Sequence, residues 1–282
     1  MIAITGATGQ LGHLVIAALL KKVPASNIVA AVRNVEKAKD LAALGVQVRH
    51  ADYDQPETWD AALKDADKVL LISSSEIGKR AKQHQSVIDA ARRTGVKLLA
   101  YTSVLHADTS VLGLAAEHRA TEFAIRASGV PHVLLRHGWY TENYAMGIPT
   151  ALKLGAVYGC AGDGRVSSAT RADYAEADVA ALTAENQAGK VYELAGDSAY
   201  TLTEFAAEIS RQSGKDIGYV NLPEAKYKKA LLGAGLPEPL AALLADSDTG
   251  VSKGGLFDDG HQLSKFIGRP TTPLATSVAA AI

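Results

Sequence analysis

Three glycines spaced three residues apart stand near the start of the chain, in the stretch ITGATGQLG. They follow a short apolar run and precede a helical pattern, which predicts a strand, a tight turn and a helix. Gly6 lets the chain turn, Gly9 lets backbone N–H groups approach a pyrophosphate, and Gly12 lets the helix pack closely on the strand. The helix N-terminus then favours negative charge. The predicted pyrophosphate site comprises Gly6, Ala7, Thr8, Gly9, Gln10, Leu11 and Gly12; a turn with tolerated glycines is the alternative.

The end of the second predicted strand indicates which dinucleotide is bound. An acidic residue at this position would bind the ribose 2′-hydroxyl of NADH. This strand ends instead in Val32-Arg33-Asn34. The planar guanidinium of Arg33 suits phosphate oxygens, so we predict NADPH, with a solvated arginine as the alternative. Lys37 and Lys39 either add positive charge near this phosphate or belong to a helix surface. Asp52 either contacts the adenine or caps the end of its strand.

A catalytic pair that is common in short-chain dehydrogenases is absent. None of the 10 tyrosines has a lysine four residues later. In that pair the tyrosine donates a proton to a carbonyl, so ordinary ketone reduction and sugar-nucleotide epimerisation lose their main support. Hydride transfer to a quinone fits better, because the charge on a conjugated acceptor is delocalised and solvent can supply the proton. The cofactor would carry that chemistry and the protein would orient it.

The first half of the chain alternates between apolar strands and helical patterns. We predict strands at 2–5, 27–33, 46–52, 68–74, 97–103 and 132–137, separated by helices that end at 20 or lie near 35–43, 56–64, 79–94 and 114–128. Continuous apolar strands separated by helices are typical of a parallel sheet buried on both faces. We therefore predict an α/β fold, a Rossmann-like doubly wound parallel sheet with a smaller C-terminal α/β lobe.

The pattern loosens after about residue 150. A helix from Arg171, a strand at 190–196, a helix at 202–213 opened by the capping box Thr201–Glu204, a strand at 217–223 and a loop at 248–260 are predicted. We expect an NADP-binding domain over 1–150 with contributions from about 155–196. A smaller substrate lobe over 197–282 is expected to pack with it as one unit.

Composition excludes several classes of function. The formal net charge is −1, which gives no support to nucleic-acid or anionic-membrane binding. The one cysteine, Cys160, allows no intrachain disulfide and no multi-cysteine metal site, and we predict that it packs in the core. The N-terminus lacks the basic segment of a signal peptide, and no apolar run approaches the ~20 residues that span a bilayer. We expect a cytoplasmic protein without a bound metal.

Several motifs together resemble one family over the whole chain: ITGATGQLG, VRN, LLISSSE, YTSVLHADTSVLGLA, RHGWYTENY, SSATRADYA, VYELAGDSA and SKGGLFDDG. They are similar to the NmrA-like branch of atypical short-chain dehydrogenase/reductases, and within it to the type-2 NADPH:quinone oxidoreductases, which are related to triphenylmethane reductase. One position departs from the family pattern, since His137 stands where an asparagine is expected.

The resemblance implies an NADPH-dependent reductase that acts on a small quinone or related conjugated acceptor. It places three serines along the nicotinamide, a segment after the sixth strand around the nicotinamide and acceptor, and a third segment over the other side of the cofactor. These residues are Ser73, Ser74 and Ser75; His137, Gly138, Trp139, Tyr140, Thr141, Glu142 and Asn143; and Ala169, Thr170, Arg171, Ala172, Asp173 and Tyr174.

The residue types agree with that placement, because ligands of open parallel sheets bind outside the carboxyl ends of the strands. Trp139, Tyr140 and Tyr144 can stack on a flat quinone or form core packing. Asn143 can bond the nicotinamide or the acceptor, or be a helix-surface amide. His118 is a candidate proton donor or a packing residue. The candidate catalytic residues are Tyr140, Asn143 and His118.

Two other functions stay open. NmrA-like proteins include NADP(H)-binding regulators without activity, and such a sensor would need no acceptor pocket; the aromatic cluster at 139–144 favours an enzyme. Reduction of triphenylmethane or azo dyes is the third reading. The physiological acceptor and homo-oligomer formation are not determined by the sequence.

Overall fold

One sheet organises the first half of the chain. The computed structural model describes all 282 residues. Its seven-stranded sheet has the order β3-β2-β1-β4-β5-β6-β8, and β1 to β6 pair in parallel. The strands are β1 (Ile2–Ile4), β2 (Ile28–Val32), β3 (Gln47–His50), β4 (Lys68–Leu71), β5 (Leu98–Val104), β6 (His132–His137) and β8 (Val191–Leu194). The predicted doubly wound parallel sheet is confirmed.

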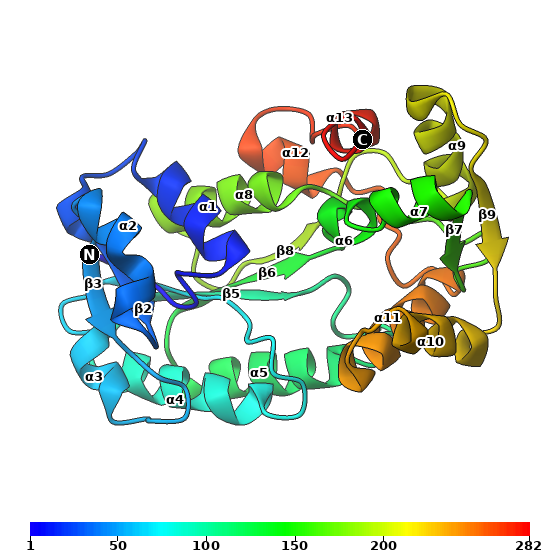
Figure 1. Cartoon of the computed structure of the whole chain (residues 1–282). Coiled ribbons are helices and arrows are strands. Elements are labelled where there is room, and N and C mark those ends of the chain that lie inside the picture. The colour runs from blue at the N-terminus through cyan, green and yellow to red at the C-terminus, as the bar shows by residue number, and fades with distance from the viewer. The chain divides into compact units, whose positions relative to one another are not determined.

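Helices cover both faces of this sheet, as Figure 1 shows, with α1 and α8 on one side and α3, α4 and α5 on the other. Their bounds are α1 (Gln10–Leu19), α2 (Lys39–Ala43), α3 (Thr58–Ala62), α4 (Arg80–Arg93), α5 (Ala115–Ser128) and α8 (Arg171–Thr183), with short 3₁₀ helices at Ala25–Asn27 and Val35–Ala38. Because the sheet is covered twice, its strands carry continuous apolar runs: every residue of β2 and β5 is buried.

The core on the α3–α5 side takes alternate residues of the central strands. Val69, Leu71, Leu99 and Tyr101 are at 0% exposure and join one apolar cluster with Trp59 of α3. The intervening residues of the same strands face the opposite side, since side chains alternate along a strand. This packing fixes the register of the sheet and hence where each strand ends.

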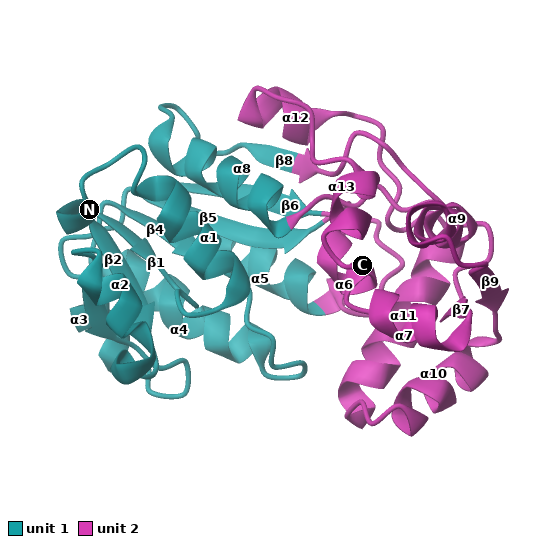
Figure 2. Cartoon of the chain, turned by 45° about the horizontal axis from the view of Figure 1, so that its top comes forward, with its two compact units in different colours: residues 1–104, 117–137, 171–192 teal, residues 105–116, 138–170, 193–282 magenta.

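The chain divides into two compact units, coloured separately in Figure 2. The first unit contains residues 1–104, 117–137 and 171–192, and the second contains 105–116, 138–170 and 193–282. In this division residues 105–116, 138–170 and 193–196 group with the C-terminal residues. The chain therefore passes between the units several times, which a reading along the sequence does not reveal.

The second unit is a smaller α/β body around two parallel strands, β7 (Ala156–Gly159) and β9 (Gly218–Asn221). Its helices are α6 (Thr141–Ala145), α7 (Ile148–Leu154), α9 (Leu202–Ser213), α10 (Glu224–Gly233), α11 (Glu238–Ser252), α12 (Gln262–Ile267) and α13 (Leu274–Ala279). The capping box at Thr201 and Glu204 is present. The predicted loop at 248–260 is wrong in its first part, because α11 continues to Ser252 and buries Asp248, Gly250 and Val251.

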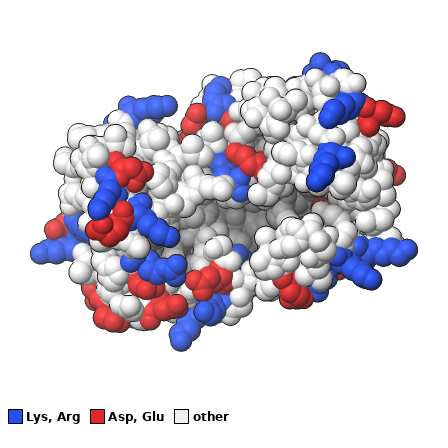
Figure 3. Space-filling view, viewed as in Figure 1, with Lys and Arg blue, Asp and Glu red and all other residues white.

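The surface carries charges of both signs. On the face shown in Figure 3, Lys and Arg side chains alternate with Asp and Glu side chains. None of the helices has both the length and the apolar character that a membrane crossing requires.

Candidate functional site

The glycine-rich turn joins β1 to α1 in a geometry that only glycine permits at two positions. Gly6 has a φ of +57°, in the left-handed region. A Cβ on Gly12 would lie 2.4 Å from the carbonyl oxygen of Gly6 and 2.7 Å from Cα of Ala7. The amide of Gly9 donates to that same Gly6 carbonyl at 2.8 Å. The turn is thus folded directly against the first turn of α1, and no side chain caps this helix.

The residues of the turn divide by exposure. Gly6, Thr8, Gly9 and Gln10 are exposed, whereas Ala7, Leu11 and Gly12 are buried. The Gly9 amide is used by the Gly6 carbonyl, and the other exposed residues can meet a phosphate with backbone N–H groups at the positive end of the α1 dipole. The buried group shapes the turn by packing.

Arg33 directly follows β2 and is 70% exposed. Its Nη1 lies 3.8 Å from Oε1 of Glu76, an exposed ion pair that holds it only weakly. The cation is therefore available to a phosphate. Lys39 forms an ion pair with Glu36 on the helix surface. The Asp52 carboxylate accepts a hydrogen bond from the amide of Asp54 at 3.0 Å, and this contact supports the alternative in which Asp52 caps its strand.

The three serines after β4 do not share one environment. Ser73 is half-buried and Ser75 is exposed, whereas Ser74 is 9% exposed and its hydroxyl donates to Oε1 of Gln83. The hydroxyls of Ser73 and Ser75 are therefore more accessible than the hydroxyl of Ser74, which is engaged by Gln83.

His118 lies inside the first unit at 5% exposure. Its Nδ1 is 2.7 Å from the hydroxyl of Tyr101, and its Nε2 is 3.3 Å from Nη1 of Arg80. Burial and the Arg80 charge hold its pKa well below the ordinary value. Both ring nitrogens are occupied and the ring stays neutral, so this geometry favours the packing alternative over proton donation.

His137 and Tyr174 also point into the first unit. Nε2 of His137 is 2.9 Å from Oδ1 of Asp178, and both side chains are at 3% exposure or less. The His137 ring stacks on Tyr174 with centroids 4.5 Å apart. Asp173 is fully buried, Arg171 is half-buried and Ala172 is exposed. The side chains at 137, 173 and 174 are thus engaged inside the first unit rather than open to solvent.

The segment after β6 forms a braced loop in the second unit. The amide of Thr141 donates to the carbonyl of Ala169 at 2.9 Å, and the amide of Ala169 donates to the carbonyl of Trp139 at 3.1 Å. The Gly138 amide donates to the carbonyl of Leu194 at 2.8 Å. The structure thus brings two of the predicted segments, 138–143 and 169–170, side by side.

Hydroxyl groups tie this loop to the rest of the second unit. The Thr141 hydroxyl is 2.8 Å from that of Ser168, which is 2.7 Å from that of Tyr200. All three line a pocket of about 160 Å³ together with residues 270–274. Trp139, Tyr140, Glu142 and Asn143 are half-buried, so their side chains keep an exposed part for a ligand.

Tyr144 is half-buried, and its hydroxyl belongs to a polar cluster around the buried Asp248. Its hydroxyl donates to Oδ1 of Asp248 at 3.1 Å, and its ring lies 6.0 Å from that of Phe205. The amide of Cys160 donates to Oδ2 of Asp248 at 3.1 Å. Burial raises the pKa of the Cys160 thiol to about 11 and that of the Asp248 carboxyl to about 6. These contacts support the core-packing alternative for Tyr144 and the packing interpretation of Cys160.

Asp248 is expected to give the chain a measurable pH dependence of stability. Its pKa is about 6 in the folded chain and 3.8 ordinarily, so the folded state keeps a proton that the unfolded state releases. The stability that this bound proton contributes is fully present below pH 3.8 and is lost as the pH rises to about 6. The total loss in the free energy of unfolding is about 3 kcal/mol. In Asp248→Asn the amide can accept from Cys160 and donate to Tyr144, so both contacts are retained.

The measurement is urea unfolding of the two chains between about pH 4 and pH 7. As the pH rises across this range, the free energy of unfolding of the variant should increase by about 3 kcal/mol relative to that of the natural chain. The pKa of His84 is lowered to about 3, which acts in the opposite direction, but it is common to both chains and cancels. A stability difference that does not change with pH would contradict this role of Asp248.

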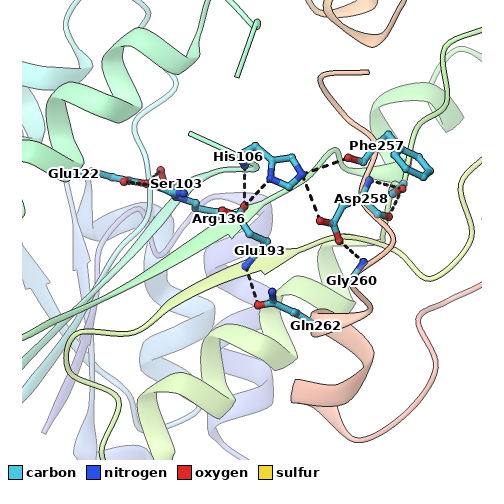
Figure 4. A network of polar contacts seen from close by, with 10 residues as sticks. Ser103, His106, Glu122, Arg136, Glu193, Phe257, Asp258, Gly260 and Gln262 are labelled. Atoms are coloured by element: carbon cyan, nitrogen blue, oxygen red, sulfur yellow. Dashed lines mark hydrogen bonds and ion pairs between the residues drawn. The ribbon is translucent and has the colours of Figure 1, made fainter. Parts of the chain in front are cut away.

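A second polar network was not expected from the sequence. His106 has a φ of +51° and its amide donates to Oε2 of Glu193 at 2.8 Å. Its Nε2 is 3.3 Å from both Oδ2 of Asp258 and the carbonyl of Phe257. Figure 4 shows Phe257 and Asp258 on one side of the ring and Glu193 on the other, with Gln262 accepting from the Glu193 amide. The network joins the segments VLHADTS and GLFDDG, whose residues carried the family resemblance.

Sequence reasoning also missed the buried residues Arg80 and His84 beneath the serine loop. Both belong to α4, one helical turn apart, and they meet the serine loop only in the folded chain, so the sequence pattern alone did not identify them. No group of three or more His, Cys, Asp or Glu side chains is arranged to hold a metal ion.

Comparisons with known proteins agree on one family. The family model described as NmrA-like family matches residues 1–274. Quinone oxidoreductase 2 of Escherichia coli is 60% identical over 279 residues, which cover 99% of this chain and 98% of the relative.

Two solved structures share the fold over their whole length. The NADPH complex of the E. coli quinone oxidoreductase QOR2 has a TM-score of 0.98 at 59% identity and covers 99% of both chains. The NADP(H) complex of the Citrobacter sp. triphenylmethane reductase has a TM-score of 0.97 at 42% identity and covers 100% of both chains.

Proposed function

The chain belongs to the NmrA-like family, and we propose that it is an enzyme that reduces quinones with NADPH by direct hydride transfer. The observation that carries this proposal is the 60% identity to E. coli quinone oxidoreductase 2 over 99% of the chain. The absence of any Tyr-x-x-x-Lys pair fits an acceptor that needs little acid catalysis.

The residues of the first unit fit the cofactor. The turn leaves no room for a side chain at Gly12, where it packs on α1, and the start of that helix offers backbone N–H groups to a pyrophosphate. Arg33 offers an exposed cation to a 2′-phosphate. In this proposal the exposed residues of 6–12 bind the pyrophosphate and Arg33 selects NADPH over NADH.

NADPH supplies the hydride when bound, and the chain's own residues orient and shield it. Ser73 and Ser75 are proposed to lie along the nicotinamide. Trp139 and Tyr140 are proposed to stack on a flat acceptor, because their rings are half-buried and keep an exposed part. The Asn143 amide is proposed to bond the nicotinamide or an acceptor oxygen.

The remaining predicted residues take supporting parts in this proposal. Gly138, Thr141, Glu142, Ala169 and Thr170 would shape the loop around the nicotinamide through the bonds between 139–141 and 169. Arg171 and Ala172 would border the cofactor. No side chain is assigned as the proton donor, since a reduced quinone delocalises its charge and water can protonate it.

The test is steady-state oxidation of NADPH with and without a simple benzoquinone, with NADH in parallel. We expect quinone-dependent oxidation of NADPH and weak activity with NADH. Tight NADPH binding without turnover of any acceptor would refute the enzyme and favour an NADP(H)-sensing regulator.

Dye reduction is the second candidate function, favoured by the likeness to the Citrobacter triphenylmethane reductase. The same assay with a triphenylmethane and an azo dye separates the two. A kcat/KM for quinones well above that for dyes supports the first proposal, and the reverse order supports the second.

Two further expectations stay predictions. Homo-oligomer formation is tested by light scattering of the purified chain, and a cytoplasmic location by fractionation of the cells that produce it.

A further inference from the structure

The loop that follows β4 has its backbone held by side chains from three different elements. The amides of residues 72, 73 and 74 donate in turn to Oγ1 of Thr5 at 3.0 Å, Oγ1 of Thr102 at 2.9 Å and Nε2 of His84 at 2.9 Å. These acceptors come from the end of β1, from β5 and from α4. Three successive peptide groups are therefore fixed from outside the loop.

The three acceptors lie away from water. Thr5 and His84 are at 0% exposure and Thr102 is at 2%. If one of them were removed, a half-buried amide would lose its partner, which costs more than an average hydrogen bond contributes. The loop conformation is thus strongly coupled to these side chains.

His84 is held in the one protonation state that can accept this bond. Burial, assisted by the Arg80 charge, lowers its pKa to about 3, so the ring is neutral. Its Nδ1 is 2.9 Å from the hydroxyl of Thr121, which itself donates to the carbonyl of Glu117. Nδ1 therefore carries the proton and Nε2 accepts from the Ser74 amide.

Arg80 holds the other side of the same loop. Its Nε donates to the carbonyl of Ser74 at 2.6 Å, and its Nη1 contacts Nε2 of His118 and lies 3.8 Å from Oε2 of Glu117. The guanidinium is buried, so its planar fork is locked by these contacts. Both the amide and the carbonyl of Ser74 are thereby fixed.

We propose that Thr102, His84 and Arg80 are positioning residues for the nicotinamide half of NADPH. β1 and β4 are neighbours in the sheet, and the chain leaves them in opposite directions to β2 and β5. A ligand binds at such a switch point, between the turn after β1 and the loop after β4. The inference rests on the proposed function, which puts Ser73 and Ser75 along the nicotinamide; these three side chains hold that loop in place.

The experiment compares two ligands by titration calorimetry: NADPH, and 2′,5′-ADP, which lacks the nicotinamide half. Thr102→Val removes the acceptor and keeps the shape of the side chain. We expect it to weaken NADPH binding about 10-fold and to leave 2′,5′-ADP within about twofold, the size of effect of one lost buried hydrogen bond. Thr102→Ser keeps the hydroxyl and should restore NADPH binding.

A second pair of variants covers the case in which Thr102→Val does not fold. Arg80→Gln removes the fork that holds the Ser74 carbonyl, and Arg92→Gln on the exposed side of the same helix is its matched control. Arg80→Gln should weaken NADPH selectively, and Arg92→Gln should bind both ligands normally.

Equal losses of affinity for NADPH and 2′,5′-ADP would show general damage to the fold and would overturn the proposal. Unchanged NADPH binding in both Thr102→Val and Arg80→Gln would also overturn it. The readout is binding and needs no turnover. If the natural chain binds NADPH but does not reduce quinones, the proposed function fails while the selective loss of NADPH binding still decides this inference.

Discussion

Gly12→Ala is expected to weaken NADPH binding severely. The added Cβ would meet the carbonyl oxygen of Gly6 at 2.4 Å and Cα of Ala7 at 2.7 Å, and both are backbone atoms that cannot rotate away. The turn must therefore open from α1, which moves its N–H groups away from the pyrophosphate. We expect a loss of affinity of at least about 100-fold, or roughly 2.7 kcal/mol, and about 1–3 kcal/mol of stability.

The measurement is NADPH titration followed by thermal unfolding, with Gly233→Ala as the matched control. Gly233 lies in helix α10, where a Cβ would meet no atom within 4 Å. Since alanine is the better helix former, this control should bind NADPH normally and gain up to about 1 kcal/mol of stability. Normal NADPH affinity in Gly12→Ala would disprove the role of the turn.

Arg33→Ala is expected to remove the preference for NADPH. A charged hydrogen bond contributes about 1.5–3 kcal/mol, so the Kd for NADPH should rise roughly 10- to 150-fold. The Kd for NADH, which has no 2′-phosphate, should stay nearly constant. The melting temperature should not change, because the side chain is 70% exposed and its ion pair with Glu76 is 3.8 Å long.

Two variants bracket this expectation. Arg33→Lys keeps the charge but not the planar fork, so its NADPH affinity should fall between those of the natural chain and the alanine variant. Lys37→Ala removes an exposed cation four residues away and should leave the ratio of NADPH to NADH affinity unchanged. Equal losses for NADPH and NADH in Arg33→Ala would show that Arg33 does not bind the 2′-phosphate.

The elements that depend on nearby residues were predicted well from the sequence. The strand at 132–137 and the helix at 202–213 have the predicted bounds, and the helix from Arg171 starts where it was expected. Each carries its own signal: a continuous apolar run, a capping box, or the change from a loop to a helical pattern. The turn at 6–12 was predicted for the same reason, because three glycines and a strand–helix context lie within a dozen residues.

Predictions that depend on distant residues were less accurate. Asp248 was placed in a loop because DTG and GG favour turns locally, but packing against Tyr144 and Cys160 keeps this segment in α11. His118 was a candidate proton donor because histidine titrates near neutrality. Its burial beside Tyr101 and Arg80 removes that property, and neither neighbour is close in sequence.

The sequence alone therefore determined the parallel sheet and the glycine turn between β1 and α1, because each follows from residue types that stand close together along the chain. The parts of this turn and of Arg33 in binding NADPH stay predictions. Only the tertiary structure decided which side chains face a ligand and which brace the loops. Three serines stand in a row at 73–75, and only the tertiary structure distinguishes them. Ser74 is held inward by hydrogen bonds with Gln83, His84 and Arg80. The burial and the hydrogen bonds of these side chains depend on helices and strands that come into contact only when the sheet has formed. A local sequence pattern therefore does not predict them.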